Sequence, residues 1–233
     1  MGCAGEHART TMGHVGRLVE EGVESVDVLF VRRWIDEIAT AIEEQRDFLT
    51  HLDSAIGDAD HGVNMQRGFA AVSSKLQESE EERPGPLLTL VGSTLISTVG
   101  GAAGPLYGSA FRQAGKALGD EDSFEPQGLL AALQAGLEAI QKLGAAAPGD
   151  KTMVDAFVPA LDALAAELDG GGSLATGATK AREAAEEGVR ATVEMQAKKG
   201  RASYLGPRSI GHQDPGATST VIIFAALERA AAS

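Results

Sequence analysis

Three aspartates that lie close together in the chain are the strongest candidates for chemistry. They are Asp53, Asp58 and Asp60, with Gly57 between the first two. On one continuous helix these spacings would point the three side chains in different directions, so they converge only if the backbone turns at Gly57. Converging carboxylates repel one another unless a cation lies between them. Oxygen ligands without cysteine favour Mg²⁺, Mn²⁺ or Ca²⁺, so this stretch predicts a divalent-metal site.

An acidic turn exposed to solvent is the competing interpretation of the same stretch. Leu52 and Ile56 lie among the aspartates and indicate that the stretch is attached to a hydrophobic core, which favours a site. His61 and Asn64 follow at or near the predicted start of a helix, where backbone N–H groups and the helix dipole favour an anion. A metal ion and a phosphate group are therefore expected to meet at this corner.

A glycine run at residues 100–105, GGAAGP, precedes another predicted helix. No Gly-Lys-Ser/Thr follows it, so it is not a Walker loop. A turn between two helices and a phosphate-binding nest of backbone N–H groups both remain compatible with it. Residues 149–155 are typical of a helix start, and Met153 within them is compatible with a place in the core.

Residues 200–216, here called the basic loop, contrast with the acidic remainder of the chain. Arg201 and Arg208 lie in this loop, directly after Lys198 and Lys199. A solvated surface loop is one interpretation, but long connections of this kind are usually functional or disordered. The loop also contains tyrosine, leucine and isoleucine, which favours order. We therefore expect it to be functional.

The elements that position these segments are predicted to be helices. Apolar residues recur at three- and four-residue steps through most of the chain, which is typical of amphipathic helices. The predicted helices cover approximately residues 31–49, 64–76, 87–99, 105–118, 129–144, 154–168, 174–198 and 217–233. The stretch VIIF at 221–224 resembles a strand, but it has no evident partner strand. We predict an all-α domain of about eight helices and no sheet over residues 31–233, with residues 1–30 as a weakly ordered N-terminal extension.

The composition narrows the choice of partners. A net charge of −13 argues against nucleic acid or an anionic membrane as a partner. The single cysteine, Cys3, cannot form an internal disulfide, and neither a secretory signal nor an apolar stretch of about 20 residues is present. These features predict a cytoplasmic protein. A chain this acidic needs bound cations if it is to hold a polyphosphate.

Four segments together resemble the L subunit, the nucleotide-binding subunit, of dihydroxyacetone kinases and the matching domain of the single-chain ATP-dependent enzymes. In order, the segments are residues 52–65, 100–108, 149–155 and 200–216. With the helices between them, the resemblance extends from about Val31 to the end of the chain. It implies a barrel of eight antiparallel amphipathic helices with the nucleotide at one end.

The resemblance also implies a role for individual residues. Asp53, Asp58 and Asp60 match the ligands of two Mg²⁺ ions that bridge the phosphates of ADP or ATP, and with Arg201 they are the predicted catalytic residues. The positions that match nucleotide contacts are His61, Gly62, Asn64, Ala102, Ala103, Gly144, Met153, Arg201, Asp214, Pro215 and Gly216. The family often has serine or threonine where this chain has Ala103, so one hydroxyl contact to phosphate is expected to be missing.

The activity implied by the resemblance is that of a kinase subunit that needs a partner. In the family, dihydroxyacetone or a related small ketose is held by a histidine of a separate K subunit, and this chain is too short to contain that module. We expect the bound ADP to be recharged by a phosphocarrier of a phosphotransferase system. An ATP-dependent kinase subunit for another small sugar and a non-catalytic nucleotide-binding adaptor are the alternatives, and a homodimer is left open.

Prenyl transferases and diphosphate lyases are also helical and rich in aspartate, but they fit the sequence less well. They place paired carboxylates about four residues apart on one helical face, which the spacing of Asp53, Asp58 and Asp60 does not match.

Overall fold

The structure is a computed structural model that describes Met1 and residues 25–232. Residues 2–24, which contain Cys3 and most of the predicted extension, and Ser233 lie outside the described residues. The helices are α1 (Val28–Glu44), α2 (Arg46–Ile56), α3 (His61–Glu78), α4 (Pro84–Thr98), α5 (Ala103–Leu118), α6 (Pro126–Gly144), α7 (Val154–Asp169), α8 (Leu174–Thr192), the 3-10 helix η1 (Arg201–Ser209) and α9 (Pro215–Ala231). Two short strands, β1 (Val26–Asp27) and β2 (Ser123–Phe124), pair antiparallel.

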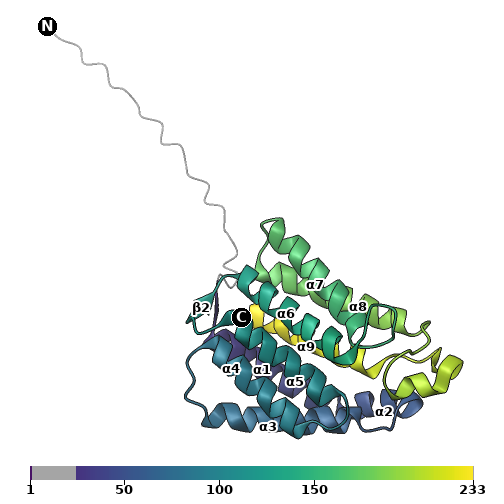
Figure 1. Cartoon of the computed structure of the whole chain (residues 1–233). Helices are drawn as coiled ribbons and strands as arrows, with labels where there is room; N and C mark the ends of the chain where they lie inside the picture. Colours follow the sequence, from purple (N-terminus) through teal and green to yellow (C-terminus); the bar gives the residue numbers. More distant parts are fainter. Residues whose placement is uncertain (2–24, 233) are drawn as a thin grey trace.

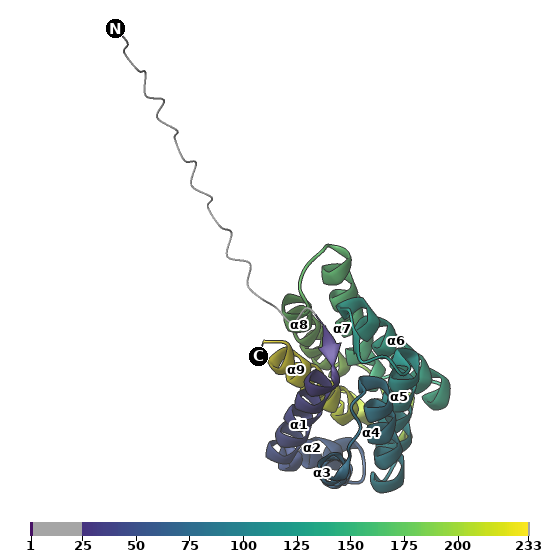
Figure 2. The ribbon, with the colours of Figure 1, turned by 90° about the vertical axis from the view of Figure 1, so that its left-hand side faces the viewer.

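Eight of the helices form a closed ring. From α3 to α9 each helix packs against the next one along the chain, and α9 packs against α1, which in turn contacts α3. Figures 1 and 2 show these helices as a bundle, with α2 at one end and the C-terminus at the other. The predicted all-α single domain is therefore confirmed. Within the described residues, no helix combines the length and the apolar character needed to cross a membrane.

A hydrophobic core fills the ring because each helix places its periodic apolar face inward. Trp34 of α1 is buried at its centre, where its indole Nε1 donates a hydrogen bond to the carbonyl oxygen of Ile223 at 3.1 Å. Its ring lies 5.7 Å from that of Phe111, measured between centroids. Helices α4 and α5 approach so closely that a Cβ atom at Gly92 would lie 2.4 Å from the carbonyl oxygen of Gly108. Only glycine permits that contact.

The first predicted helix is two helices in the structure. The sequence predicts one helix over residues 31–49 and an irregular stretch after it, whereas α1 ends at Glu44 and α2 begins at Arg46. The residues of α2 that are buried are Leu49, Asp53 and Ile56, at helical spacing on one face. An aspartate in the middle of that face hides the apolar pattern from sequence analysis. Residues 51–56 are therefore helical, and the prediction of an irregular stretch there is wrong.

The prediction of no sheet is wrong for two residues in each of two segments. Val26 pairs with Phe124 and is fully buried, and the side chain of Asp27 accepts a hydrogen bond from the backbone N–H of Phe30 at 2.8 Å, which caps α1. The described fold thus begins about five residues before residue 31, the predicted start of the domain. Residues 221–224, which resemble a strand in sequence, lie in α9.

The connection between α8 and α9, residues 193–214, differs from the prediction at its start. Helix α8 ends at Thr192 and not near Lys198. The next carbonyl, that of Val193, accepts a hydrogen bond from the backbone N–H of Gly211 at 2.8 Å, so the chain leaves the helix to pair with its own returning strand of connection. Within the basic loop, η1 forms successive turns with a break at Gly206, whose φ is 56°. The connection is ordered, as the sequence predicts.

Candidate functional site

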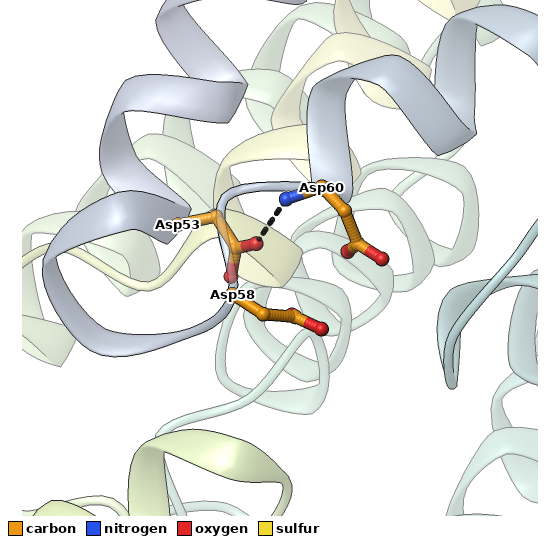
Figure 3. A group of neighbouring side chains, drawn as sticks. All are labelled: Asp53, Asp58 and Asp60. Carbon is orange, nitrogen blue, oxygen red and sulfur yellow. Dashed lines mark hydrogen bonds between the residues drawn. The ribbon is translucent and has the colours of Figure 1, made fainter.

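The three aspartates lie at the turn between α2 and α3. Asp53 belongs to the last turn of α2, Asp58 lies in the turn, and Asp60 directly precedes α3. One carboxylate oxygen from each residue lies within 4.8 Å of the other two. Figure 3 shows the side chains gathered at this turn. The prediction that they converge is confirmed, and the cluster is compact enough for its oxygens to share a divalent cation.

Asp53 is held in place by the backbone that follows it. Its Oδ2 accepts hydrogen bonds from the backbone N–H groups of Asp60 at 2.9 Å and His61 at 3.2 Å (Figure 3). A Cβ atom at Gly57 would lie 1.9 Å from the Oδ1 of Asp53, so glycine is required there for close approach. The left-handed residue of the turn is instead Ala59, with φ 61°. The carboxylate of Asp53 is therefore fixed before any ligand arrives.

Arg201 reaches the cluster from the basic loop. Its guanidinium Nε lies 2.9 Å from the Oδ2 of Asp58, and the two side chains are 69% and 36% exposed. Ion pairs this exposed contribute little to stability, so the pair is easily exchanged for other partners. Arg201 is the guanidinium placed to meet a phosphate group beside the aspartates.

A cavity of about 380 Å³ opens beside the aspartate cluster. The predicted site residues that line it are Asp53, Asp58, Asp60, His61, Asn64, Ala102, Ala103, Gly144, Met153, Arg201, Asp214, Pro215 and Gly216. Gly62 is the predicted residue that does not line the cavity. A Cβ atom at Gly62 would lie 2.0 Å from the carbonyl oxygen of Arg46, so this glycine lets α3 pack closely against α2. The structure thus brings together segments that are far apart in the sequence.

Two helix N-termini face the cavity. Helix α5 begins after Ala102 without a hydrogen bond from a capping side chain, and Gly101 turns the preceding chain with φ 66°. The first N–H groups of a helix without such a cap are suited to an anion. Helix α9 begins at Pro215, next to Asp214. Donors for an anion and acceptors for a cation therefore line one cavity.

Asp214 is a buried carboxylate at the start of α9. Its Oδ2 accepts a hydrogen bond from the backbone N–H of Ala217 at 2.7 Å, and its own N–H donates to the Oγ1 of Thr192 at 3.0 Å. Burial raises the pKa of Asp214 to about 7, although the hydrogen bond from Ala217 and the charge of Lys151 act in the opposite direction. Asp214 is thus a cap and a carboxylate whose charge is sensitive to its surroundings.

A buried polar network joins α3, α5 and α9 beneath the cavity. The Nε2 of His61 lies 3.0 Å from the Oγ of Ser219, which lies 2.8 Å from the hydroxyl of Tyr107. That hydroxyl also donates to the carbonyl oxygen of Gly216 at 2.9 Å. Burial lowers the pKa of His61 more than the nearby charges of Asp53 and Asp60 raise it, which keeps the ring neutral. Tyr107 therefore supports two predicted contact positions, His61 and Gly216.

Several cavity residues are missing from the predicted set. Leu106, Ile140 and Val154 provide an apolar wall, and Lys151 lies among the lining residues. In the sequence the three apolar residues are indistinguishable from other core positions of their helices. Lys151 gives no signal either, because a lysine at a helix start is usually solvated. The cavity as a whole joins an acidic cluster, anion donors and an apolar wall, which suits a phosphorylated ligand with a flat apolar group and accompanying cations.

Comparisons with known proteins agree with this description. A family model described as the DAK2 domain matches residues 55–229. The chain is 42% identical over 198 residues to the ADP-binding subunit DhaL of the PEP-dependent dihydroxyacetone kinase of Escherichia coli (strain K12), covering 85% of this chain and 94% of that protein. It is 40% identical over 195 residues to the ADP-binding subunit DhaL of the PTS-dependent dihydroxyacetone kinase of Lactococcus lactis, covering 83% and 93%.

A solved structure shares the fold. The dihydroxyacetone kinase of C. freundii in its native form aligns with a TM-score of 0.67 and 25% identity. The alignment covers 96% of this chain and 38% of that chain, so this chain spans little more than a third of the longer kinase. The match therefore concerns one part of a larger enzyme.

Proposed function

The chain belongs to the DAK2 domain family, and from that membership we propose that it is the ADP-binding subunit of a dihydroxyacetone-type kinase. It transfers a phosphoryl group to dihydroxyacetone, or to a related small ketose, held by a separate K subunit. The observation that carries this proposal is the single cavity lined by the aspartate cluster, Arg201 and the starts of α5 and α9. Relatives that match the chain over nearly their whole length are named ADP-binding subunits, which supports it.

Asp53, Asp58 and Asp60 are the residues that would hold Mg²⁺, which we propose to be two ions. Their carboxylate oxygens lie close enough together to share cations, and hard oxygen ligands suit this metal. Bound Mg²⁺ neutralises phosphate oxygens during transfer. In this acidic chain, with its net charge of −13, the cations are what allows a polyphosphate to approach the cluster.

The protein's own groups bind and orient the nucleotide. The backbone N–H groups at Ala102 and Ala103 donate to phosphate oxygens at the start of α5, where the side chain of Ala103 offers no hydroxyl. Arg201 leaves its exposed pair with Asp58 and holds phosphate oxygens with its guanidinium. Leu106, Ile140 and Met153 provide the apolar wall for the base, next to Gly144.

Recharging of the bound ADP by a phosphocarrier is the arrangement that we propose for the donor side. Its support is that the Lactococcus lactis relative is named a PTS-dependent kinase subunit and the Escherichia coli relative a PEP-dependent one. A bound nucleotide that is recharged in place acts as a cofactor, and it should stay with the protein during purification. In the alternative, an ATP-dependent kinase, the nucleotide exchanges with each turnover.

Mass spectrometry of the gently purified protein tests the proposal directly. Retained ADP is the expected result, and formation of dihydroxyacetone phosphate is expected once a K subunit, dihydroxyacetone and a phosphocarrier are added. The Asp58→Asn protein is the matched control and should retain no nucleotide. Turnover with ATP alone would favour the exchanging kinase. Nucleotide binding without turnover with any K subunit would favour a non-catalytic adaptor.

A further inference from the structure

Lys151 is a buried cation that the proposed function leaves without a role. Its residue is only 1% exposed. Its ammonium Nζ donates hydrogen bonds to the carbonyl oxygens of Thr192 at 2.8 Å, Met195 at 3.1 Å, Ser209 at 2.7 Å and His212 at 2.5 Å. A buried ammonium is costly unless it is well partnered, and here the four carbonyl dipoles supply the partners.

The four carbonyls belong to the two ends of the α8–α9 connection. Thr192 and Met195 lie where the chain leaves α8, whereas Ser209 and His212 lie where it returns to α9. Lys151 itself comes from the separate connection between α6 and α7. Its ammonium therefore ties together both ends of the connection from outside.

Backbone bonds follow the same pattern but leave the ammonium at the centre. The N–H of Gly211 donates to the carbonyl of Val193 at 2.8 Å, and the N–H of Lys198 donates to the carbonyl of Asp150 at 3.0 Å. Lys151 has φ 61°, in the left-handed region that a lysine rarely adopts. The strained backbone directs the side chain inward, a combination that more often marks a functional constraint than a solvated surface lysine.

The part of the connection between the tied ends carries the groups that face the nucleotide cavity. Arg201 extends from it to Asp58 at 2.9 Å. At its end, Asp214 is bonded through its N–H to the Oγ1 of Thr192, and the carbonyl of that threonine is one of the ammonium's acceptors. Movement of the tied ends would therefore move Arg201 and Asp214 together.

We propose that Lys151 is a positioning residue, whose ammonium closes the α8–α9 connection and so fixes Arg201 and Asp214 at the nucleotide cavity. It touches no reacting atom in this role. The proposal rests on the proposed function only for the identity of the ligand, Mg²⁺ with ADP. The closure of the connection can be tested without any nucleotide.

Limited digestion of the full chain with trypsin, without nucleotide, is the first test. Lys198, Lys199, Arg201 and Arg208 are trypsin sites that lie between the tied ends. In Lys151→Met, cleavage at these four sites is expected to be faster by about tenfold or more, because the ammonium's bonds no longer oppose opening. Lys116→Met, at an exposed position in the last turn of α5, is the matched control and should cleave like the wild type.

The location of the cuts separates positioning from general stabilisation. Helix content by circular dichroism should remain that of the wild type, and the additional cuts should fall between residues 198 and 208. Lys151→Arg keeps a cation with several donors and should recover part of the protection. Wild-type cleavage of Lys151→Met would overturn the proposal, as would cuts spread evenly along the chain or a Lys151→Arg protein that opens as readily as Lys151→Met.

Calorimetric titration with ADP and Mg²⁺ is the second test. The affinity of Lys151→Met should fall by about tenfold or more, and that of Lys116→Met should not change. If the wild type itself binds no nucleotide, the proposed function fails while the digestion still decides the role of Lys151. Wild-type affinity in Lys151→Met would overturn the link from the tied ends to the site.

A measurement on the wild type covers the case in which Lys151→Met does not fold. Amine-reactive acetylation, followed by mass spectrometry, reports how often each lysine is accessible. Lys151 should react about a hundredfold more slowly than Lys198, whose side chain is 61% exposed. Equal rates of acetylation would show that the ends of the connection open freely, and would overturn the proposal.

Discussion

The guanidinium of Arg201 and the carboxylate of Asp58 form an ion pair at the cavity, with 2.9 Å between Nε and Oδ2. The two residues are separated by most of the chain, and contacts between α2 and η1 bring them together. Both are exposed enough for the pair to contribute no more than about 1 kcal/mol. Asp58 can therefore turn to a cation, and Arg201 to a phosphate group, at little cost.

Arg201→Lys should separate nucleotide binding from phosphoryl transfer. A lysine keeps the charge but loses the planar fork that holds two phosphate oxygens at once. We expect most of the affinity for ADP to remain, and transfer to the K subunit to slow by roughly tenfold or more. The measurement is a coupled assay with the partner subunit at saturating nucleotide. Arg208→Lys is the control and should be milder, because Arg208 does not line the cavity. Wild-type transfer by Arg201→Lys would contradict the assignment.

Asp58→Asn and Asp53→Asn should differ although both remove a carboxylate. Each is expected to abolish Mg²⁺-dependent binding of ADP. Asp58→Asn should leave the free energy of unfolding within about 1 kcal/mol of the wild type, because it loses only an exposed ion pair.

Asp53→Asn should cost about 1–2 kcal/mol more, since the Oδ2 of Asp53 accepts two backbone hydrogen bonds at the start of α3. Calorimetric titration and denaturant unfolding measure the two effects. Unchanged affinity for ADP in both proteins would remove the metal assignment, and equal stabilities would remove the structural role of Asp53.

The contrast between these two aspartates also shows what the sequence could predict. The convergence of Asp53, Asp58 and Asp60 was predictable, because no single helical face fits their spacing. The placement of Asp53 within α2 was not predictable, because a buried aspartate looks like a break in the apolar pattern. Gly57 was expected to permit a turn, but its lack of a side chain serves the close approach to Asp53, and Ala59 adopts the left-handed conformation. Such contacts depend on distances that spacing alone does not contain.

The helices show the same division. Eight periodic segments sufficed to predict the ring, since each needs an apolar neighbour on its inner face. The end of α8 at Thr192 depends on bonds to Gly211 and to Lys151, which are distant in the sequence. The role of Lys151 was invisible for the same reason, because all four of its acceptors are backbone carbonyls and leave no trace in residue type.

ADP and Mg²⁺ should stabilise the protein strongly only when both are present. The acidic cluster repels phosphates unless cations are bound, and the cations lack part of their ligands unless phosphates are bound. With both present at about a hundredfold excess over their dissociation constants, linkage predicts about 2.7 kcal/mol and a rise in melting temperature of about 5–10 °C. Thermal unfolding with ADP, with Mg²⁺, with both, and with ADP plus a chelator measures this. An equal rise with ADP in the chelator would show that the cations are not needed.

Asp214 should make the stability of the nucleotide-free protein depend on pH. Burial raises its pKa from about 3.8 to about 7, so the folded state binds a proton that the unfolded chain has already released. Stability from this group is therefore complete below about pH 4 and is lost as the pH rises towards and through 7. Asp214→Asn keeps an oxygen that can accept from the N–H of Ala217 but cannot acquire a charge.

The melting temperature of Asp214→Asn, relative to the wild type, should thus increase steadily between pH 5 and pH 8. Asp120→Asn, at a side chain that is 80% exposed, is the control and should show no such trend. Thermal unfolding of the three proteins in matched buffers without metal or nucleotide provides the comparison. A difference between Asp214→Asn and the wild type that stays constant over this range would mean that Asp214 is already ionised in the folded protein. In that case the ammonium of Lys151 and the N–H of Ala217 would outweigh the cost of its burial.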